Sequence, residues 1–206
     1  MPRVVAHSFL SACAITLVAA CGGGDETPAG SSDEVSAAGA GSAEGLSATL
    51  VDPEGTEVGT VQLSEVEGGT QVSVRVTGLP PGFHGFHLHA VGVCEPDSAN
   101  PADPSMTGDF LSAGGHIGAG EADHGDHPGD LPALFVAESG AGSLTSVTGA
   151  VTLADLTDND GSAVMVHADR DNFANIPERY APGGPDEMTR NTGDAGGRIA
   201  CGPVED

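Results

Sequence analysis

The chain has 206 residues, with 30 Asp and Glu against six Arg and no Lys, so its formal net charge is −24. Such a composition excludes nucleic acid, or an anionic lipid surface, as a partner held by a basic patch. The length suits a single domain, and the acidic charge is typical of a well-solvated surface.

The start of the chain is typical of an export signal. Arg3 precedes the apolar run 9–20, which is shorter than the roughly 20 residues of a membrane-spanning helix. The run ends in small residues directly before Cys21, a pattern that resembles the bacterial lipoprotein box. We expect residues 1–20 to be removed and Cys21 to be acylated. The alternative is ordinary signal cleavage that leaves a free thiol on Cys21.

This interpretation predicts where the protein resides. We expect the protein to be exported and anchored as a lipoprotein to the outer face of the cell membrane, with only its lipid in contact with that membrane. Residues 21–45 are rich in Gly, Ser and Ala, and Val35 is the one large apolar residue among them. They cannot bury enough surface to fold, so we interpret them as a flexible tether. The folded domain is predicted to span residues 46–206.

The domain begins with alternating apolar and polar residues, separated by turns rich in Asp, Pro and Gly, and this period of two predicts strands. No segment has a convincing helical stripe, so the fold class is all-β, a sandwich or barrel. Two long irregular stretches, 94–129 and 168–198, are predicted to be functional loops. The predicted strands are 46–51, 59–63, 72–77, 85–91, 131–137, 146–153 and 163–167.

A pair of histidines lies on one of these predicted strands. His87 and His89 are two residues apart and therefore point to the same face, while Phe86 and Leu88 point to the other. Such a pair alone is as often structural as metal-binding. His116 and His167 provide two further imidazoles, and four imidazoles suit a copper ion that changes oxidation state.

A second group of ligands lies in the first long loop. His124, His127 and Asp130 offer the nitrogen and oxygen donors that suit tetrahedral zinc. The alternative for this segment is an acidic surface loop that happens to contain histidines.

The cysteines also divide by location. Cys13 is removed with the signal and Cys21 takes the lipid, which leaves Cys94 and Cys201 as one possible pair. Export favours a disulfide between them.

Five motifs now stand in order along the chain: GFHGFHLHAVGVC, SAGGHIG, HGDHPGDLP, VMVHADRDNF and TGDAGGRIACG. Together they resemble the copper/zinc superoxide dismutases over nearly the whole of residues 46–203. The resemblance implies a Greek-key β-sandwich. It also implies copper on His87, His89, His116 and His167, zinc on His116, His124, His127 and Asp130, and a Cys94–Cys201 disulfide.

The resemblance assigns three further roles. Arg198 would dock the substrate anion beside copper, and the carboxylate of Asp171 would link a copper ligand to a zinc ligand. His84 matches a position that is not a ligand and would be a hydrogen-bonded structural residue. The sequence departs from many family members in having only two residues between His124 and His127, although all four zinc ligands are present.

The implied activity is the disproportionation of superoxide to O2 and hydrogen peroxide at a redox-cycling copper, with His116 and Arg198 as catalytic residues, and it would protect the cell exterior. Two other classes fit the same residues less well. A protein that stores or buffers copper or zinc at the cell surface needs no docking arginine, and a sandwich kept for structure or partner contact needs no ligands. The sequence does not indicate an oligomeric state.

Overall fold

The structure is a computed structural model that describes residues 45–206. The predicted signal peptide, the acylated Cys21 and the predicted tether up to residue 44 lie outside the described residues. The strands are β1 Gly45–Val51, β2 Glu57–Val66, β3 Gly69–Val76, β4 Gly82–His84, β5 Phe86–His89, β6 Ser98–Ala99, β7 Thr107–Gly108, β8 Leu134–Val136, β9 Gly142–Thr148, β10 Ala163–His167 and β11 Arg198–Pro203. The helices are η1 Leu111–Ala113, α1 Leu153–Leu156 and α2 Glu187–Thr192.

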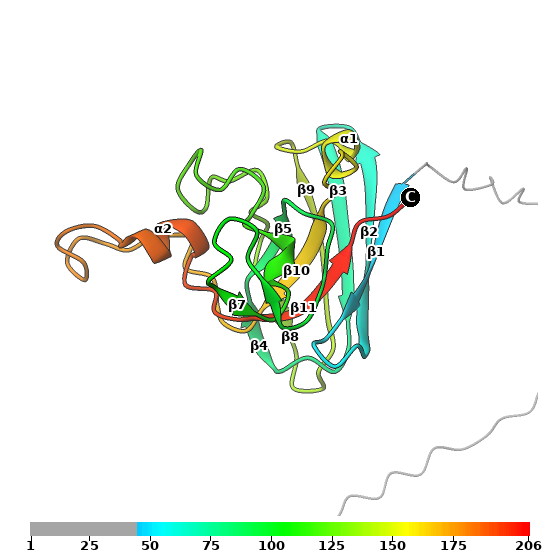
Figure 1. Cartoon of the computed structure of the whole chain (residues 1–206), viewed down its shortest axis with the longest axis horizontal. Coiled ribbons are helices and arrows are strands. Elements are labelled where there is room, and N and C mark those ends of the chain that lie inside the picture. Colours follow the sequence, from blue (N-terminus) through cyan, green and yellow to red (C-terminus); the bar gives the residue numbers. More distant parts are fainter. Residues whose placement is uncertain (1–44) are drawn as a thin grey trace, which may run out of the picture. The chain divides into compact units, whose positions relative to one another are not determined.

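Nine strands form one curved sheet, in the order β4-β8-β9-β3-β2-β1-β11-β10-β5. β4 and β5 are separated in the chain by Gly85 alone, so the two ends of this order meet and the sheet is almost closed into a barrel (Figure 1). β3 pairs with β9, and β1 with β11, across long connections of the kind that define a Greek key. The all-β prediction is confirmed.

The core follows from the alternation of the sequence. In β1, Leu46, Ala48 and Leu50 are buried, while the side chains between them are more exposed. The same pattern in β2 and β3 directs their valines and leucines inward, where they pack against Phe86 and Leu88 of β5. Removing this apolar surface from water is the main favourable term in folding, so the core holds the strands that carry the candidate ligands.

Two parts of the sequence form structures that the pattern does not predict. The predicted strand 146–153 is wrong at its end, because β9 stops at Thr148 and α1 begins at Leu153. Thr152 caps this helix and shares reciprocal hydrogen bonds with Asp155, a capping box that favours a helical turn over a strand. β11 is the second difference: Arg198–Pro203 has a glycine and a proline near its end and no clear alternation.

The two predicted long loops are present and contain short elements. The first holds η1 and the two-stranded β6–β7 sheet, and the Cys94–Cys201 disulfide ties its start to β11, with 5.7 Å between the Cα atoms. The second holds α2, which extends away from the barrel with its flanking turns (Figure 1). Within residues 45–206, no helix is long and apolar enough to cross a membrane.

Candidate metal centre

β5 presents two imidazoles on one face, as its alternation predicts. His87 and His89 are both buried, and Phe86 and Leu88, on the opposite face, belong to the hydrophobic core. Backbone pairing with β10 fixes the position of β5 in the sheet. The two ring positions are thus set by the barrel itself rather than by a loop.

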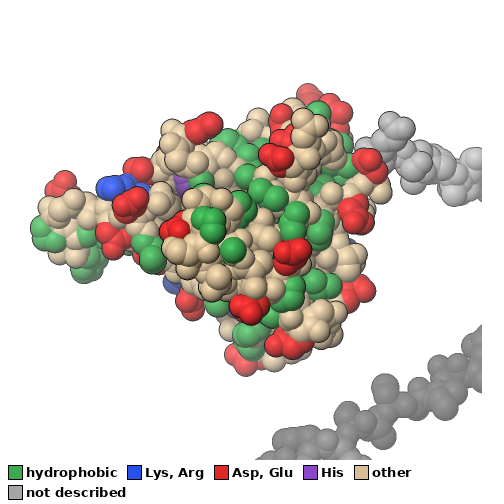
Figure 2. Space-filling view, viewed as in Figure 1, with side chains coloured by type: hydrophobic (Ala, Val, Ile, Leu, Met, Phe, Trp, Pro, Cys, Tyr) green, Lys and Arg blue, Asp and Glu red, His purple; other side chains and the backbone are tan. Residues whose placement is uncertain are grey.

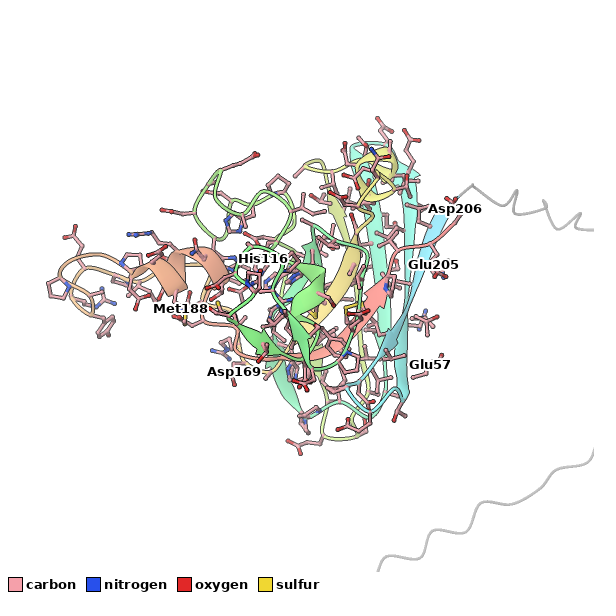
Figure 3. The ribbon with its side chains drawn as sticks, viewed as in Figure 1. Glu57, His116, Asp169, Met188, Glu205 and Asp206 are labelled. Atoms are coloured by element: carbon pink, nitrogen blue, oxygen red, sulfur yellow. A yellow bond between two sulfur atoms is a disulfide. The ribbon has the colours of Figure 1, made fainter. Side chains whose placement is uncertain are left out.

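The other two predicted copper ligands meet this pair from different directions. His167 ends β10, beside β5 in the sheet. His116 follows η1 and forms an isolated antiparallel bridge with His89, which brings the first long loop against β5 (Figure 3). The ring of His116 lies 4.1 Å from that of His87 and 5.0 Å from that of His89, measured between centroids. Candidate ligand atoms of all four histidines lie within 4.8 Å of one another.

Hydrogen bonds at the far side of each ring determine which nitrogen faces the centre. Nδ1 of His89 donates to the carbonyl of Gly114 at 3.0 Å, and Nδ1 of His167 donates to the carbonyl of Gly196 at 3.2 Å. A neutral imidazole with a proton on Nδ1 has a lone pair on Nε2. These two Nε2 atoms lie 3.4 Å apart. Two lone pairs at this distance repel each other unless a cation lies between them.

Asp171 fixes one ligand of each predicted metal. Its carboxylate accepts hydrogen bonds from Nε2 of His87 at 2.7 Å and from Nε2 of His124 at 2.8 Å. The Nδ1 atoms of both rings are buried and have no hydrogen-bond partner among the described residues. A carboxylate that orients two metal ligands in this way is a common arrangement around metal sites.

The predicted zinc ligands surround Asp130. Its Oδ1 lies 2.9 Å from Nδ1 of His116 and 3.1 Å from Nδ1 of His124. Nδ1 of His127 lies 3.3 Å from Oδ2 of the same carboxylate, and it too is buried without a hydrogen-bond partner in the described part of the chain. The Nε2 of His127 donates to the carbonyl of Ala122, so its lone pair is on Nδ1. Three imidazole Nδ1 atoms therefore converge on one carboxylate.

His127 lies slightly outside the tightest grouping on this side. The atoms within 4.8 Å of one another come from His87, His116, His124 and Asp130, and His87 takes the place predicted for His127. We assign His87 to the other centre, because it also belongs to the group of four histidines and its Nε2 donates to Asp171, which leaves Nδ1 as its ligand atom. Because Nδ1 of His127 faces Asp130, the short spacing between His124 and His127 still allows both rings to reach it.

The protonation states fit cation binding. Burial holds the pKa of His89 and His167 well below the usual value, reinforced by neighbouring positive groups, and burial lowers the pKa of His116 to about 4 although Asp130 raises it. Burial also lowers the pKa of His87. These rings are neutral at pH 7, the form in which imidazole binds metal.

His124 differs from the other ligands in its protonation. Burial favours its neutral form, but hydrogen bonds and charge from Asp130 and Asp171 outweigh burial and raise its pKa to about 9. The imidazoles beside Asp130 and Asp171 hold the pKa of both carboxyls far below the usual range, although burial acts in the opposite direction. A metal ion that binds His124 must therefore displace a proton.

Arg198 lies next to the first group of histidines. It begins β11, where it pairs with His167 across the sheet. Its guanidinium donates hydrogen bonds to the carbonyls of Phe110 and Gly114, and the Gly114 carbonyl also accepts from His89. Burial lowers the pKa of Arg198 to about 10, so the group stays charged at pH 7. It is partly exposed and places a fixed cation beside the first group of histidines.

Several supporting groups were not predicted from the sequence. Backbone carbonyls of Gly114, Gly196 and Ala122 orient three of the rings, and a carbonyl carries no side-chain signature. The glycines in SAGGHIG and DAGGR are the only sequence signal for the first two. His84 is a buried structural residue, as predicted: its ring nitrogens lie 2.8 Å from the carbonyls of His167 and Pro80.

A nearly closed Greek-key barrel with two adjoining histidine clusters that have imidazoles in common defines a class of paired-metal β-barrel proteins. Comparison with known families identifies it further. The copper/zinc superoxide dismutase (SODC) family matches residues 57–204, so the chain belongs to this family. Superoxide dismutation is accordingly its activity, and copper and zinc are its cofactors.

Individual relatives agree with this assignment. The chain is 41% identical over 228 aligned positions to the Cu-Zn superoxide dismutase of Mycolicibacterium paratuberculosis, with 99% of both chains covered. It is 44% identical to that of Mycobacterium tuberculosis, over 79% of this chain and 70% of the relative. The Cu/Zn superoxide dismutase from Brucella abortus matches in structure with a TM-score of 0.59 and 31% identity, over 79% of this chain and 100% of that one.

A SOD-like protein from Bacillus subtilis also matches, as a double mutant, with a TM-score of 0.60 and 29% identity. The match covers 78% of this chain and 97% of that chain. Fold and sequence comparisons thus lead to the same family. They favour the enzyme over the metal-storage and purely structural alternatives.

Proposed function

We propose that this superoxide dismutase works at the surface of the cell, held there by a lipid on Cys21, and that it protects the cell exterior. We further propose that Arg198 docks superoxide and that Asp171 orients one ligand of each metal. The proposed copper ligands are His87, His89, His116 and His167, and the proposed zinc ligands are His116, His124, His127 and Asp130.

One observation carries the assignment of the metal ligands. In each ligand ring except the shared ring of His116, one nitrogen faces a cluster centre and the other donates a hydrogen bond to a carbonyl or a carboxylate. The buried Nδ1 atoms of His87, His124 and His127 have no hydrogen-bond partner among residues 45–206. An unpaired polar atom that is buried costs free energy, and cations at the two centres would remove this cost.

The overall reaction is 2 O2⁻ + 2 H⁺ → O2 + H2O2. Copper, when bound, supplies the one-electron oxidation and reduction that this disproportionation needs. Arg198 would hold the anion at the mouth of the cluster, because its guanidinium is charged and its orientation is fixed by two carbonyls. Nδ1 of His116 faces Asp130 at 2.9 Å, which leaves Nε2 as the atom that holds a proton and passes it to the reduced product.

His116→Ala tests this assignment. We expect the wild type, loaded with both metals, to consume superoxide in a copper-dependent way, and the variant to lose most of that activity together with zinc, because both clusters lose a ligand. Metal content and superoxide consumption are measured on the same samples. Equal activity in the two proteins would contradict the role of His116, and equal, negligible activity would favour a storage protein.

The surface location rests on the lipoprotein-like signal and on the long polar segment after Cys21. The full chain is expressed in a bacterial host that acylates lipoproteins, beside Cys21→Ser. We expect the wild type to incorporate labelled fatty acid and to sediment with membranes, and the variant to do neither. Membrane association that does not depend on Cys21 would contradict the proposed anchor.

A further inference from the structure

His124 is held mainly by residues outside the segment that contains it. Its Nε2 donates to Asp171, and its ring stacks on that of Phe173, with 6.2 Å between centroids and 12° between planes. Its backbone N–H donates to the carbonyl of Arg190 in α2 at 2.6 Å. All three partners belong to the second long loop, 168–198.

Gly193 completes this enclosure. It caps the C-terminal end of α2 in the left-handed conformation (φ 59°, ψ 22°), and its N–H donates to the carbonyl of Thr189. A Cβ atom at this position would overlap both the carboxylate of Asp171 and the imidazole of His124. The close approach of α2 to this hydrogen-bonded pair therefore requires a residue without a side chain, in addition to the left-handed backbone that favours glycine.

The end of α2 is itself fastened to the segment that follows Asp171. The N–H of Asn172 donates to the carbonyl of Gly193 at 2.9 Å, and the hydroxyl of Thr189 donates to the carboxylate of Asp194 at 3.0 Å. The side-chain amide of Asn172 also donates to Asp194. These bonds close the second loop into one unit, with Gly193 against His124.

His127 has different support. Its Nε2 donates to the carbonyl of Ala122, and its backbone N–H donates to Asp130 at 3.0 Å, both within its own loop. The two proposed zinc ligands His124 and His127 are thus positioned by different loops. Only two residues separate them, so the segment that carries them is too short to enclose His124 on its own.

We propose that Gly193 is a positioning residue for zinc: its lack of a side chain lets the end of α2 close on the His124–Asp171 pair and fix Nδ1 of His124 toward Asp130. This inference rests on the zinc assignment made above. It makes the second loop, rather than the loop that supplies the ligands, responsible for the position of His124. Displacing supporting groups around a metal ligand typically lowers metal affinity by about 10- to 100-fold.

Gly193→Ala tests the inference, with Gly184→Ala as its matched control. Gly184 lies in the same loop and also has positive φ (78°), but nothing lies within 4 Å of a Cβ added there. Both variants place alanine at a positive φ, and only Gly193→Ala introduces the overlap. Each full-length protein is stripped of metal and titrated with Co²⁺, whose visible absorption reports tetrahedral coordination, and with Zn²⁺ against a chromophoric chelator; Cu²⁺ binding is followed by EPR.

We expect Gly193→Ala to bind Zn²⁺ and Co²⁺ about 10- to 100-fold more weakly than the wild type, with one equivalent of Cu²⁺ still bound, and Gly184→Ala to match the wild type. Unchanged zinc affinity in a folded Gly193→Ala would overturn the inference, and so would an equal loss of copper and zinc, which a merely structural role predicts. A wild type that binds neither Zn²⁺ nor Co²⁺ would overturn the zinc assignment itself, and the inference with it.

Thr189→Val provides a second variant in case Gly193→Ala does not fold. It keeps the shape of the side chain and removes its hydrogen bond to Asp194, which loosens the end of α2 without introducing an overlap. We expect zinc affinity to fall about fivefold, the effect of losing one buried hydrogen bond, with copper binding unchanged. Wild-type zinc affinity in Thr189→Val would count against a role for α2 in holding His124.

Discussion

The two halves of the metal centre are built in different ways. His87, His89 and His167 lie on paired strands of the barrel, next to a core that is buried on folding. The other half takes His124, His127 and Asp130 from one loop and its supporting contacts largely from another. The geometry on the copper side therefore follows from the fold, whereas the position of His124 on the zinc side depends on contacts between two loops. Substitutions on the two sides should therefore have separable effects.

Loss of a strand ligand should have the largest effect. We expect His89→Ala to abolish stoichiometric copper binding and to lower superoxide dismutation by more than about 100-fold, beyond what loss of a supporting residue costs. Zinc should remain bound, because His89 is not near Asp130, and the far-UV circular dichroism should match the wild type. Loss of zinc together with copper would show that the two halves are not separable.

Asp171→Asn should affect the zinc half more than the copper half. An amide is uncharged and has an NH2 group in place of one oxygen, so it is a weaker acceptor for His87 and His124, and His124 has fewer strand contacts to hold it. We expect zinc affinity to fall about 10- to 100-fold and copper affinity to fall less. Asp169→Asn is the matched control, because Asp169 is exposed and this substitution removes the same charge two residues away. Equal losses of affinity for both metals would contradict this difference between the zinc half and the copper half.

Arg198→Ala should slow the reaction without removing either metal. We expect the second-order rate constant to fall at least about tenfold, because the charged, pre-oriented donor for the anion is lost while every proposed ligand remains. Arg198→Lys, which keeps the charge but not the two-carbonyl geometry, should recover part of the rate. Stopped-flow measurement of superoxide decay provides the comparison, and an unchanged rate in the alanine variant would remove Arg198 from the mechanism.

Ionic strength should have the smallest effect. Acidic side chains are spread over the face shown in Figure 2, whereas the basic side chains visible there gather at α2. Salt screens charges beyond about 8 Å at physiological strength, so attraction by Arg198 should dominate near the site. We expect added salt to slow the reaction severalfold at most, measured over a series of sodium chloride concentrations. A rate that rises with salt would mean that the net charge of −24 impedes capture.

The division between ligands on strands and ligands on loops also explains how much of the structure could be predicted from the sequence. Alternation in β1, β3 and β5 predicted the strands, and with them the common face of His87 and His89, because a period of two dictates which side chains share a face. The Cys94–Cys201 pair was predicted from the resemblance and is confirmed. β11 was missed because its pairing with β1 and β10 is a long-range contact that leaves no local pattern.

The supporting groups of the site were beyond prediction for a related reason. Gly193, Arg190 and Phe173 contact His124 through a close backbone approach, a carbonyl and a ring stack, and none of these contacts follows a spacing that can be recognised in the sequence. Gly193 is one of 32 glycines in the chain, and only the folded second loop shows that its missing Cβ faces His124. Candidate metal ligands can be recognised in the sequence by their residue type, whereas the orientation of their side chains depends on packing.

The carbonyl of Gly114 is a single acceptor shared by His89 and Arg198. One peptide group thus sets both the angle of a ring proposed to bind copper and the position of the cation proposed to receive the substrate. An engineer who reshapes the entrance to admit a different anion, by moving the turn before His116, would at the same time tilt His89. Substrate choice and copper environment cannot be varied independently in this scaffold while that carbonyl serves both groups.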